Sequence, residues 1–124
     1  MFDRAKAQKK KKKSEQVIVN GVAWDEDKIK DLIDRNDKAV CRAILRIYSF
    51  QTDEEKYMGV TKTVNGKGFN KVDVEMLSSF AIQLRRGQDL TYKQMYIARI
   101  KIKKYAKQLL SYMKQREEEK KLTL

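Results

Sequence analysis

Apolar residues recur at helical spacing along most of the chain. The pattern predicts helices over roughly 26–35, 38–51, 72–86 and 92–118. Asp25, and either Asn36 or Asp37, are suited to cap the first two helices, because a short polar side chain can accept a hydrogen bond from a free backbone N–H. The sequence TDEE, which begins at Thr52, matches a capping box and predicts a further short helix that ends near Met58.

The last predicted helix is the longest and has the clearest pattern. Thr91 and Gln94 form a second capping box at its start, and Gly87 stands where the preceding helix should end. Steps of three and four residues join six side chains into one apolar stripe. The stripe consists of Met95, Ala98, Ile102, Tyr105, Leu109 and Met113. We therefore expect this helix to dock by its stripe on the helices near 38–51 and 72–86.

Two segments break the helical pattern. The sequence QVIVNGV at 16–22 combines β-branched residues with Asn20-Gly21, which is typical of a short strand and turn. Three glycines within residues 59–70 predict either a loop or a small hairpin about Asn65-Gly66. The fold class that follows is mainly α: a compact bundle of four or five helices with a long C-terminal helix, with or without one small β-hairpin.

The chain length predicts one domain, because 124 residues suit a single modest core. We place this helical domain at 16–118. Residues 1–15 contain five consecutive lysines and little to bury, which predicts a disordered basic tail, with a fraying helix as the alternative. Residues 119–124 are expected to form a flexible C-terminus.

Charge is distributed unevenly around a net charge of +12. Residues 1–13 hold seven basic residues against one acidic residue, whereas residues 14–79 hold ten against twelve. Residues 80–124 hold twelve against four. The excess of positive charge therefore lies at the two ends of the sequence, which favours a polyanionic partner such as DNA or RNA.

The composition also excludes several kinds of site. Cys41 is the only cysteine and the chain has no histidine, which excludes an intrachain disulfide, a zinc finger and a Ser-His or Cys-His nucleophile. No apolar run approaches the length of a membrane span, and the basic N-terminus lacks the apolar stretch of a signal peptide. We expect a cytoplasmic protein with no membrane partner.

A ridge of basic side chains runs beside the apolar stripe of the last helix. Arg99, Lys103 and Lys107 are spaced by four residues, and Lys101 and Lys104 widen the ridge. Three further bases precede the helix or lie at its start, namely Arg85, Arg86 and Lys93. Such side chains can neutralise phosphates and release counterions. The alternative is an ordinary solvated helix face, although alternating acids are missing until Glu117–Glu119.

Other residues are weaker candidates for nucleic-acid contact. Tyr92 and Tyr96 lie one turn apart and off the centre of the stripe, where they are suited to stack on bases. Lys67 lies between two glycines, although the loop lacks the spacing of a Walker A motif and a structural turn is the alternative. The tail lysines, Lys9, Lys10, Lys11, Lys12 and Lys13, can add affinity that does not depend on base sequence.

Acidic clusters near the starts of two predicted helices permit a third interpretation, a metal-dependent nuclease. Two carboxylates can hold a metal for phosphodiester cleavage. Helix capping and the helix dipole explain the same carboxylates, which include Asp25, Glu26 and Asp27. We therefore predict no catalytic residue, no metal site and no cofactor.

Several short motifs, taken in order, resemble a module of small phage and mobile-element proteins. They are RAILRIY at 42–48, QT at 51–52 with EE at 54–55, NGKGFN at 65–70, DVEMLSSF at 73–80, LTYKQ at 90–94, AR at 98–99 and KYAKQL at 104–109. A similar module occurs beside helicase and other DNA-metabolism domains. The resemblance covers roughly residues 17–113 and leaves out the basic extension at 4–13. It implies a phage or prophage origin, in a host-cell cytoplasm, and a nucleic-acid context, and it supplies no catalytic residues.

Two functional hypotheses follow from these patterns. The first is a non-catalytic, phage-type accessory protein that binds DNA or RNA phosphates through its basic tail and basic C-terminal helix. The second is a phage inhibitor of a host defence complex, similar to an anti-CRISPR protein, that binds a host or phage protein or a ribonucleoprotein complex.

Overall fold

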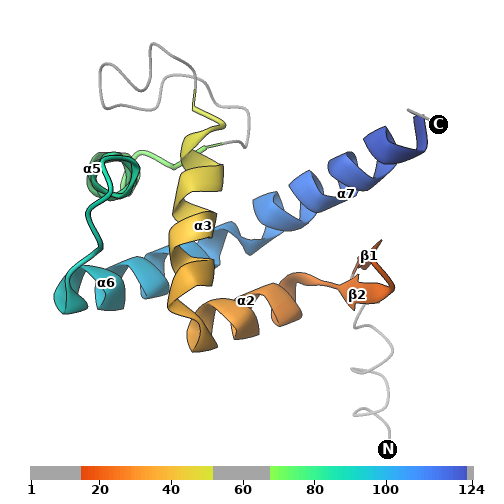
Figure 1. The fold of residues 1–124 in the computed structure, drawn as a ribbon, viewed down its shortest axis with the longest axis horizontal. Helices are drawn as coiled ribbons and strands as arrows, with labels where there is room; N and C mark the ends of the chain where they lie inside the picture. The colour runs from red at the N-terminus through yellow and green to blue at the C-terminus, as the bar shows by residue number, and fades with distance from the viewer. Residues whose placement is uncertain (1–14, 52–67, 123–124) are drawn as a thin grey trace, which may run out of the picture.

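The computed structural model describes residues 15–51 and 68–122, which form a helical domain with one small hairpin (Figure 1). Strands β1 (Val17–Val19) and β2 (Val22–Trp24) come first, followed by helices α2 (Glu26–Arg35) and α3 (Asp37–Tyr48). Helix α5 (Val74–Arg85) precedes α6 (Tyr92–Ile102), a 3₁₀ segment η1 (Lys103–Tyr105) and α7 (Ala106–Leu122). The predicted basic tail, the short helix at 52–58 and the loop about Asn65-Gly66 lie outside the described residues.

The short strand and turn predicted within residues 16–22 are confirmed, and a second strand completes a small hairpin. Strands β1 and β2 are antiparallel, and Val17 pairs with Trp24 across the ladder. Both turn residues have positive φ, 51° at Asn20 and 80° at Gly21, as a two-residue type I′ turn requires. Asn and Gly tolerate this conformation better than other residues, so the local sequence alone determines the turn.

Helices α2 and α3 begin where their caps predict. Asp25 accepts a hydrogen bond from the backbone N–H of Lys28 at 2.8 Å, and Asn36 accepts one from Ala39 at 3.1 Å. Of the two residues considered for the second cap, Asn36 therefore takes that role. Helix α3 ends at Tyr48, three residues before the predicted end.

The predicted C-terminal helix is present as a rod made of α6, η1 and α7. Thr91 and Gln94 form the predicted capping box at its start. The rod continues to Leu122, so the helix covers most of the segment that was predicted to be flexible. In Figure 1, α3 stands across this rod, while α2 lies below α3 and connects it to the hairpin.

The core lies where α3 meets α5 and the rod. Val40, Ile44 and Ile47 of α3 are fully buried, together with Leu77 of α5 and Ile102 of α6. The predicted apolar stripe is confirmed: Ala98, Ile102 and Tyr105 are buried, and Met95, Leu109 and Met113 pack against the core as partly buried side chains. The stripe therefore fixes which side of the rod faces inward.

Two glycines with positive φ end or connect elements, and their surroundings differ. Gly87 (φ 86°) follows α5 and has open space where a Cβ would stand. Its N–H bonds to the carbonyl of Leu84, and Gln88 bonds to Gln83, which is a C-terminal cap of the predicted kind. Gly68 (φ 85°) has no such space, because a Cβ there would overlap the side-chain oxygen of Gln51 and lie 2.8 Å from its Cδ.

We predict that Gly68→Ala destabilises the domain more than Gly87→Ala. Both substitutions introduce a Cβ where the backbone is in the left-handed region, which lowers the free energy of unfolding by about 1–2 kcal/mol. Gly68→Ala additionally displaces the buried Gln51, which accepts a hydrogen bond from the N–H of Phe69. Urea unfolding of the two variants and the parent protein measures the difference. Equal losses in the free energy of unfolding would contradict the close approach of Gln51 to Gly68.

Candidate nucleic-acid interface

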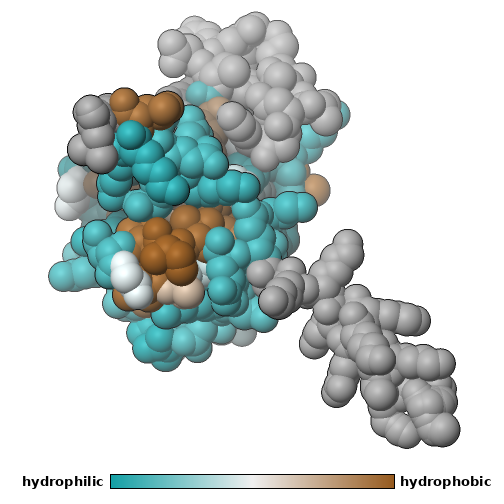
Figure 2. Space-filling view, turned by 90° about the vertical axis from the view of Figure 1, so that its right-hand side faces the viewer, coloured by the Kyte–Doolittle hydropathy of each residue, from teal (hydrophilic) through white to brown (hydrophobic). Residues whose placement is uncertain are grey.

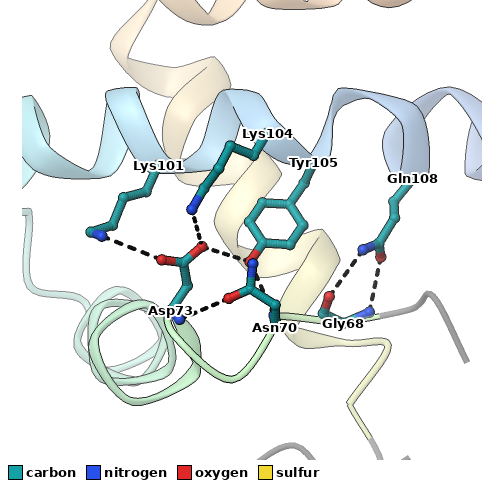
Figure 3. A network of polar contacts seen from close by, with 7 residues as sticks. All are labelled: Gly68, Asn70, Asp73, Lys101, Lys104, Tyr105 and Gln108. Atoms are coloured by element: carbon teal, nitrogen blue, oxygen red, sulfur yellow. Dashed lines mark hydrogen bonds and ion pairs between the residues drawn. The ribbon is translucent and has the colours of Figure 1, made fainter. Parts of the chain in front are cut away.

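A cluster of polar side chains fastens the chain around residue 70 to the middle of the rod (Figure 3). The buried carboxylate of Asp73 accepts a hydrogen bond from the hydroxyl of Tyr105 at 2.7 Å. That hydroxyl in turn accepts the N–H of Asn70 at 3.0 Å. One turn further along the rod, the amide of Gln108 bonds to both the N–H and the carbonyl of Gly68, at 2.9 and 3.0 Å.

Two lysines of the predicted basic ridge belong to this cluster. Lys104 Nζ lies 2.7 Å from one oxygen of Asp73, and Lys101 Nζ lies 3.3 Å from the other oxygen. Lys101 lies in α6 and Lys104 in η1, and side chains three residues apart lie on the same face of a helix. The two lysines thus hold a structural carboxylate in place.

The charge of Asp73 is stabilised by these neighbours. Burial by itself would raise the pKa of this carboxyl, but hydrogen bonds from Lys104, Tyr105 and Lys101 outweigh burial and hold the pKa below its ordinary value. Burial and the Asp73 carboxylate both raise the pKa of the Tyr105 hydroxyl, which stays protonated as a donor. The cluster therefore remains an ion pair at neutral pH.

Two further ridge residues bind carboxylates of the first two helices. Arg99 is mostly covered, pairs with Asp37, and donates through Nε to the carbonyl of Ile33 at 2.9 Å. Lys103 pairs with Asp34 at 2.8 Å. Arg99, Lys101, Lys103 and Lys104 therefore do not stand free, because each binds a carboxylate of the domain itself. Their role as phosphate contacts stays a prediction.

The remaining ridge residue is Lys107. Its side chain is exposed, and no ion pair joins it to any carboxylate of residues 15–51 or 68–122. Lys67 and the five tail lysines lie outside the described residues, so the interpretation of those six as phosphate contacts stays a prediction.

The residues just before and at the start of α6 form a separate basic surface, which we call the α5–α6 corner. Arg85, Arg86 and Lys93 are exposed there, and none of them pairs with a carboxylate that the structure describes. Tyr92 and Tyr96 are 89% and 64% exposed. Of the residues predicted to bind nucleic acid, these five are the ones that the structure leaves available together.

The corner is held together by hydrogen bonds between α5 and α6. The side-chain amides of Gln83 and Gln94 bond to each other twice, at 3.0 Å each. Gln94 also accepts the N–H of Thr91 at 2.9 Å, as its part of the capping box. Because Gln83 lies within one turn of the two arginines and Gln94 lies within one turn of both tyrosines, the five side chains share one end of the domain.

A second row of bases was not predicted. Lys38, Arg42 and Arg46 follow one another at intervals of four along α3, and all three line an open groove between α2, α3 and α7. Their spacing was visible in the sequence as a polar row beside the buried positions of α3. It was missed because the three bases lie in the segment whose total charge is slightly negative.

The described part of the chain contains neither a cluster suited to a metal ion nor a helix suited to span a membrane. Within residues 15–51 and 68–122, no group of three or more Cys, Asp or Glu side chains is arranged to hold a metal ion. Among the described helices, none is both long and apolar enough to cross a bilayer.

We predict that Asp73→Asn destabilises the domain by about 2–3 kcal/mol at neutral pH, because it leaves two lysines and a tyrosine hydroxyl without their charged acceptor. Since the folded-state pKa of Asp73 is lowered, its contribution is complete above the ordinary pKa of about 3.9 and is lost as pH falls through the folded value. The stability gap between Asp73→Asn and the parent should therefore narrow at pH 3.

Denaturant unfolding at pH 7 and pH 3 tests this prediction. The matched control is Asp31→Asn, which breaks an exposed pair with Arg35 and should cost at most about 1 kcal/mol. A gap for Asp73→Asn that is as small as that of the control, or that does not change with pH, would contradict the prediction.

Comparison with known proteins does not assign these surfaces. No family model matches the chain, and neither a curated protein nor a solved structure matches it. The resemblance to a phage and mobile-element module therefore stays a prediction from the motifs. What can be said of function depends on the geometry of the two basic surfaces.

Proposed function

We propose that the protein is a non-catalytic accessory protein that binds single-stranded DNA or RNA at the α5–α6 corner. The observation that carries this proposal is the combination of three unpaired cations with two exposed tyrosines on one end of the domain. Cations hold the phosphates of a strand, while aromatic rings stack on its bases, and single strands expose both. The phage context implied by the sequence motifs agrees with such a role.

The placement of Lys93 supports binding rather than helix stability. Lys93 is in the first turn of α6, which contains no acidic residue. A cation near the positive end of a helix dipole costs about 0.3–1 kcal/mol, so this lysine does not serve the helix. Arg85 lies in the last turn of α5, where the dipole does favour a cation, and it therefore has a structural explanation as well.

The two tyrosines support single strands over duplex. Tyr92 and Tyr96 are successive residues of one helical row, four positions apart, and their rings extend into solvent without contributing to the core. Neither hydroxyl has a hydrogen-bond partner among the described residues. Unstacked bases can lie on such rings, whereas the bases of a duplex are already stacked on each other.

The remaining charge supplies long-range attraction. Four ridge cations are offset by the carboxylates of Asp34, Asp37 and Asp73, but the chain as a whole keeps a net charge of +12. A field of that sign raises the rate at which a polyanion meets the protein. The lysines at 9–13 add to this attraction and do not distinguish one base sequence from another.

We predict that replacing Arg85, Arg86 and Lys93 together by Gln weakens binding to a single-stranded oligonucleotide and flattens its salt dependence. Each lost phosphate contact should reduce the slope of log affinity against log salt by about 0.7. The matched control replaces three exposed lysines elsewhere, Lys30, Lys71 and Lys121, with the same change in net charge. Fluorescence anisotropy titrations at several salt concentrations provide the measurement, and equal effects of the two triple variants would place the contacts elsewhere.

We predict that Tyr92→Ala and Tyr96→Ala each weaken single-strand binding by about 1–3 kcal/mol, the usual value of one stacked base. Affinity for duplex should change little, because its bases are not available to the rings. Tyr92→Phe and Tyr96→Phe keep the aromatic face and should bind like the parent protein. If a Phe variant loses as much affinity as the Ala variant, the tyrosine hydroxyl, and not stacking of the ring, makes the contact.

A further inference from the structure

The groove between α2, α3 and α7 has an apolar floor. Its volume is about 920 Å³, and its deepest lining residues, such as Ile29 and Ile33, belong to the core. Leu32, Leu109 and Met113 also line it and remain partly exposed. An open apolar surface of this size on a small domain indicates a binding site.

One wall of the groove is positively charged. Lys38, Arg42 and Arg46 line it, and no Asp or Glu is among the described residues that line the groove. None of the three forms an ion pair with an acidic residue that the structure describes. Lys38 lies near the start of α3, where the helix dipole disfavours a cation, so the stability of α3 does not explain this lysine, whereas Arg46 in the last turn is favoured by the dipole.

The hairpin adds apolar surface beside the groove. Trp24 belongs to β2 and lines the groove as well. Ile18 and Val22 of the same hairpin are 57% and 40% exposed. Figure 2, which views the side of the molecule that carries the hairpin, shows a compact apolar patch surrounded by hydrophilic side chains. A ligand in the groove can therefore extend its apolar contacts onto the hairpin.

We infer that this groove binds an acidic amphipathic helix of a partner protein. Residues four apart on a helix are about 6 Å apart along its axis, so Lys38, Arg42 and Arg46 form a row with that repeat. Carboxylates spaced by four on a partner helix have the same repeat. An apolar stripe next to such an acidic row would contact the leucines and methionine of the floor.

A strand and a nucleic acid suit the groove less well. In a strand, an acidic row and an apolar row alternate to opposite faces, so only one of them could face the groove. A nucleic acid would find an aliphatic floor. Its two aromatic rings, Trp24 and Tyr112, already lie against cations. The ammonium of Lys28 is 5.0 Å from the centroid of Trp24, and the guanidinium groups of Arg46 and Arg116 are 4.2 and 5.7 Å from that of Tyr112. Only a helix presents both rows on one side.

The test uses the full chain and a fluorescent synthetic peptide of about 18 residues, since shorter isolated helices are marginal in water. The peptide carries leucines at helical spacing beside a row of glutamates. A scrambled peptide of the same composition removes the apolar stripe but keeps the charge. We expect the first peptide to bind at least about tenfold more tightly than the scrambled one.

Two pairs of variants locate the site. Arg42→Glu should weaken peptide binding at least tenfold and leave oligonucleotide binding nearly unchanged, whereas Arg85→Glu should do the opposite. Leu32→Gln, in the floor, should weaken peptide binding about fivefold or more, whereas Ile100→Gln, exposed on α6, should not. Circular dichroism checks the fold, and Lys38→Glu replaces Arg42→Glu if the latter does not fold.

Three results would overturn the inference. The first is no preference for the stripe-bearing peptide over the scrambled one. The second is equal loss of peptide binding in Arg42→Glu and Arg85→Glu, which would indicate unspecific attraction to charge. The third is displacement of the peptide by an oligonucleotide whose binding Arg42→Glu also weakens, which would assign the groove to nucleic acid. The proposed function fails separately, through unchanged oligonucleotide binding in Arg85→Glu.

Discussion

The buried carboxylate of Asp73 is the contact on which the arrangement of the domain depends. It precedes α5 and binds Lys101, Lys104 and Tyr105 of the rod, so it fixes how α5 sits relative to α6 and η1. A carboxylate removed from water is costly unless it is fully paired, so the rod must present its donors there. This pairing acts together with the buried apolar stripe to orient the rod, and the opposite side remains for other contacts.

Local features of the fold could be predicted because each depends on neighbours in the sequence. The caps at Asp25 and Thr91 and the Asn20-Gly21 turn all follow from side-chain and backbone preferences within a few residues. The partners of Arg99 and Lys103 could not be predicted in this way. Asp37 and Asp34 are more than sixty positions away in the chain, and only packing brings them together. The helical periodicity of the sequence predicted the row of bases, but it could not identify the carboxylates that pair with them.

The candidate site illustrates the same division. Tyr92, Tyr96 and Lys93 could be recognised as unusual at the start of a helix, because position within a helix can be inferred locally. The row on α3 needed the structure, since its meaning depends on the apolar floor that α2 and α7 provide. The domain thus uses one group of cations to hold itself together and leaves two other groups at its surface. Total charge cannot separate these groups, because both kinds count equally in the sequence.

The length of the rod has an electrostatic consequence. At 1.5 Å per residue, the glutamates at 117–119 lie about 37 Å from Lys93 along the α6–α7 axis. Mobile ions screen exposed charges over about 8 Å at physiological ionic strength, so more than four screening lengths separate these glutamates from the basic end. The three glutamates, whose charge is offset locally by Arg116, Lys120 and Lys121, therefore neither repel a strand arriving at the opposite end nor weaken the attraction it experiences, so the two ends of the rod act independently in electrostatic terms.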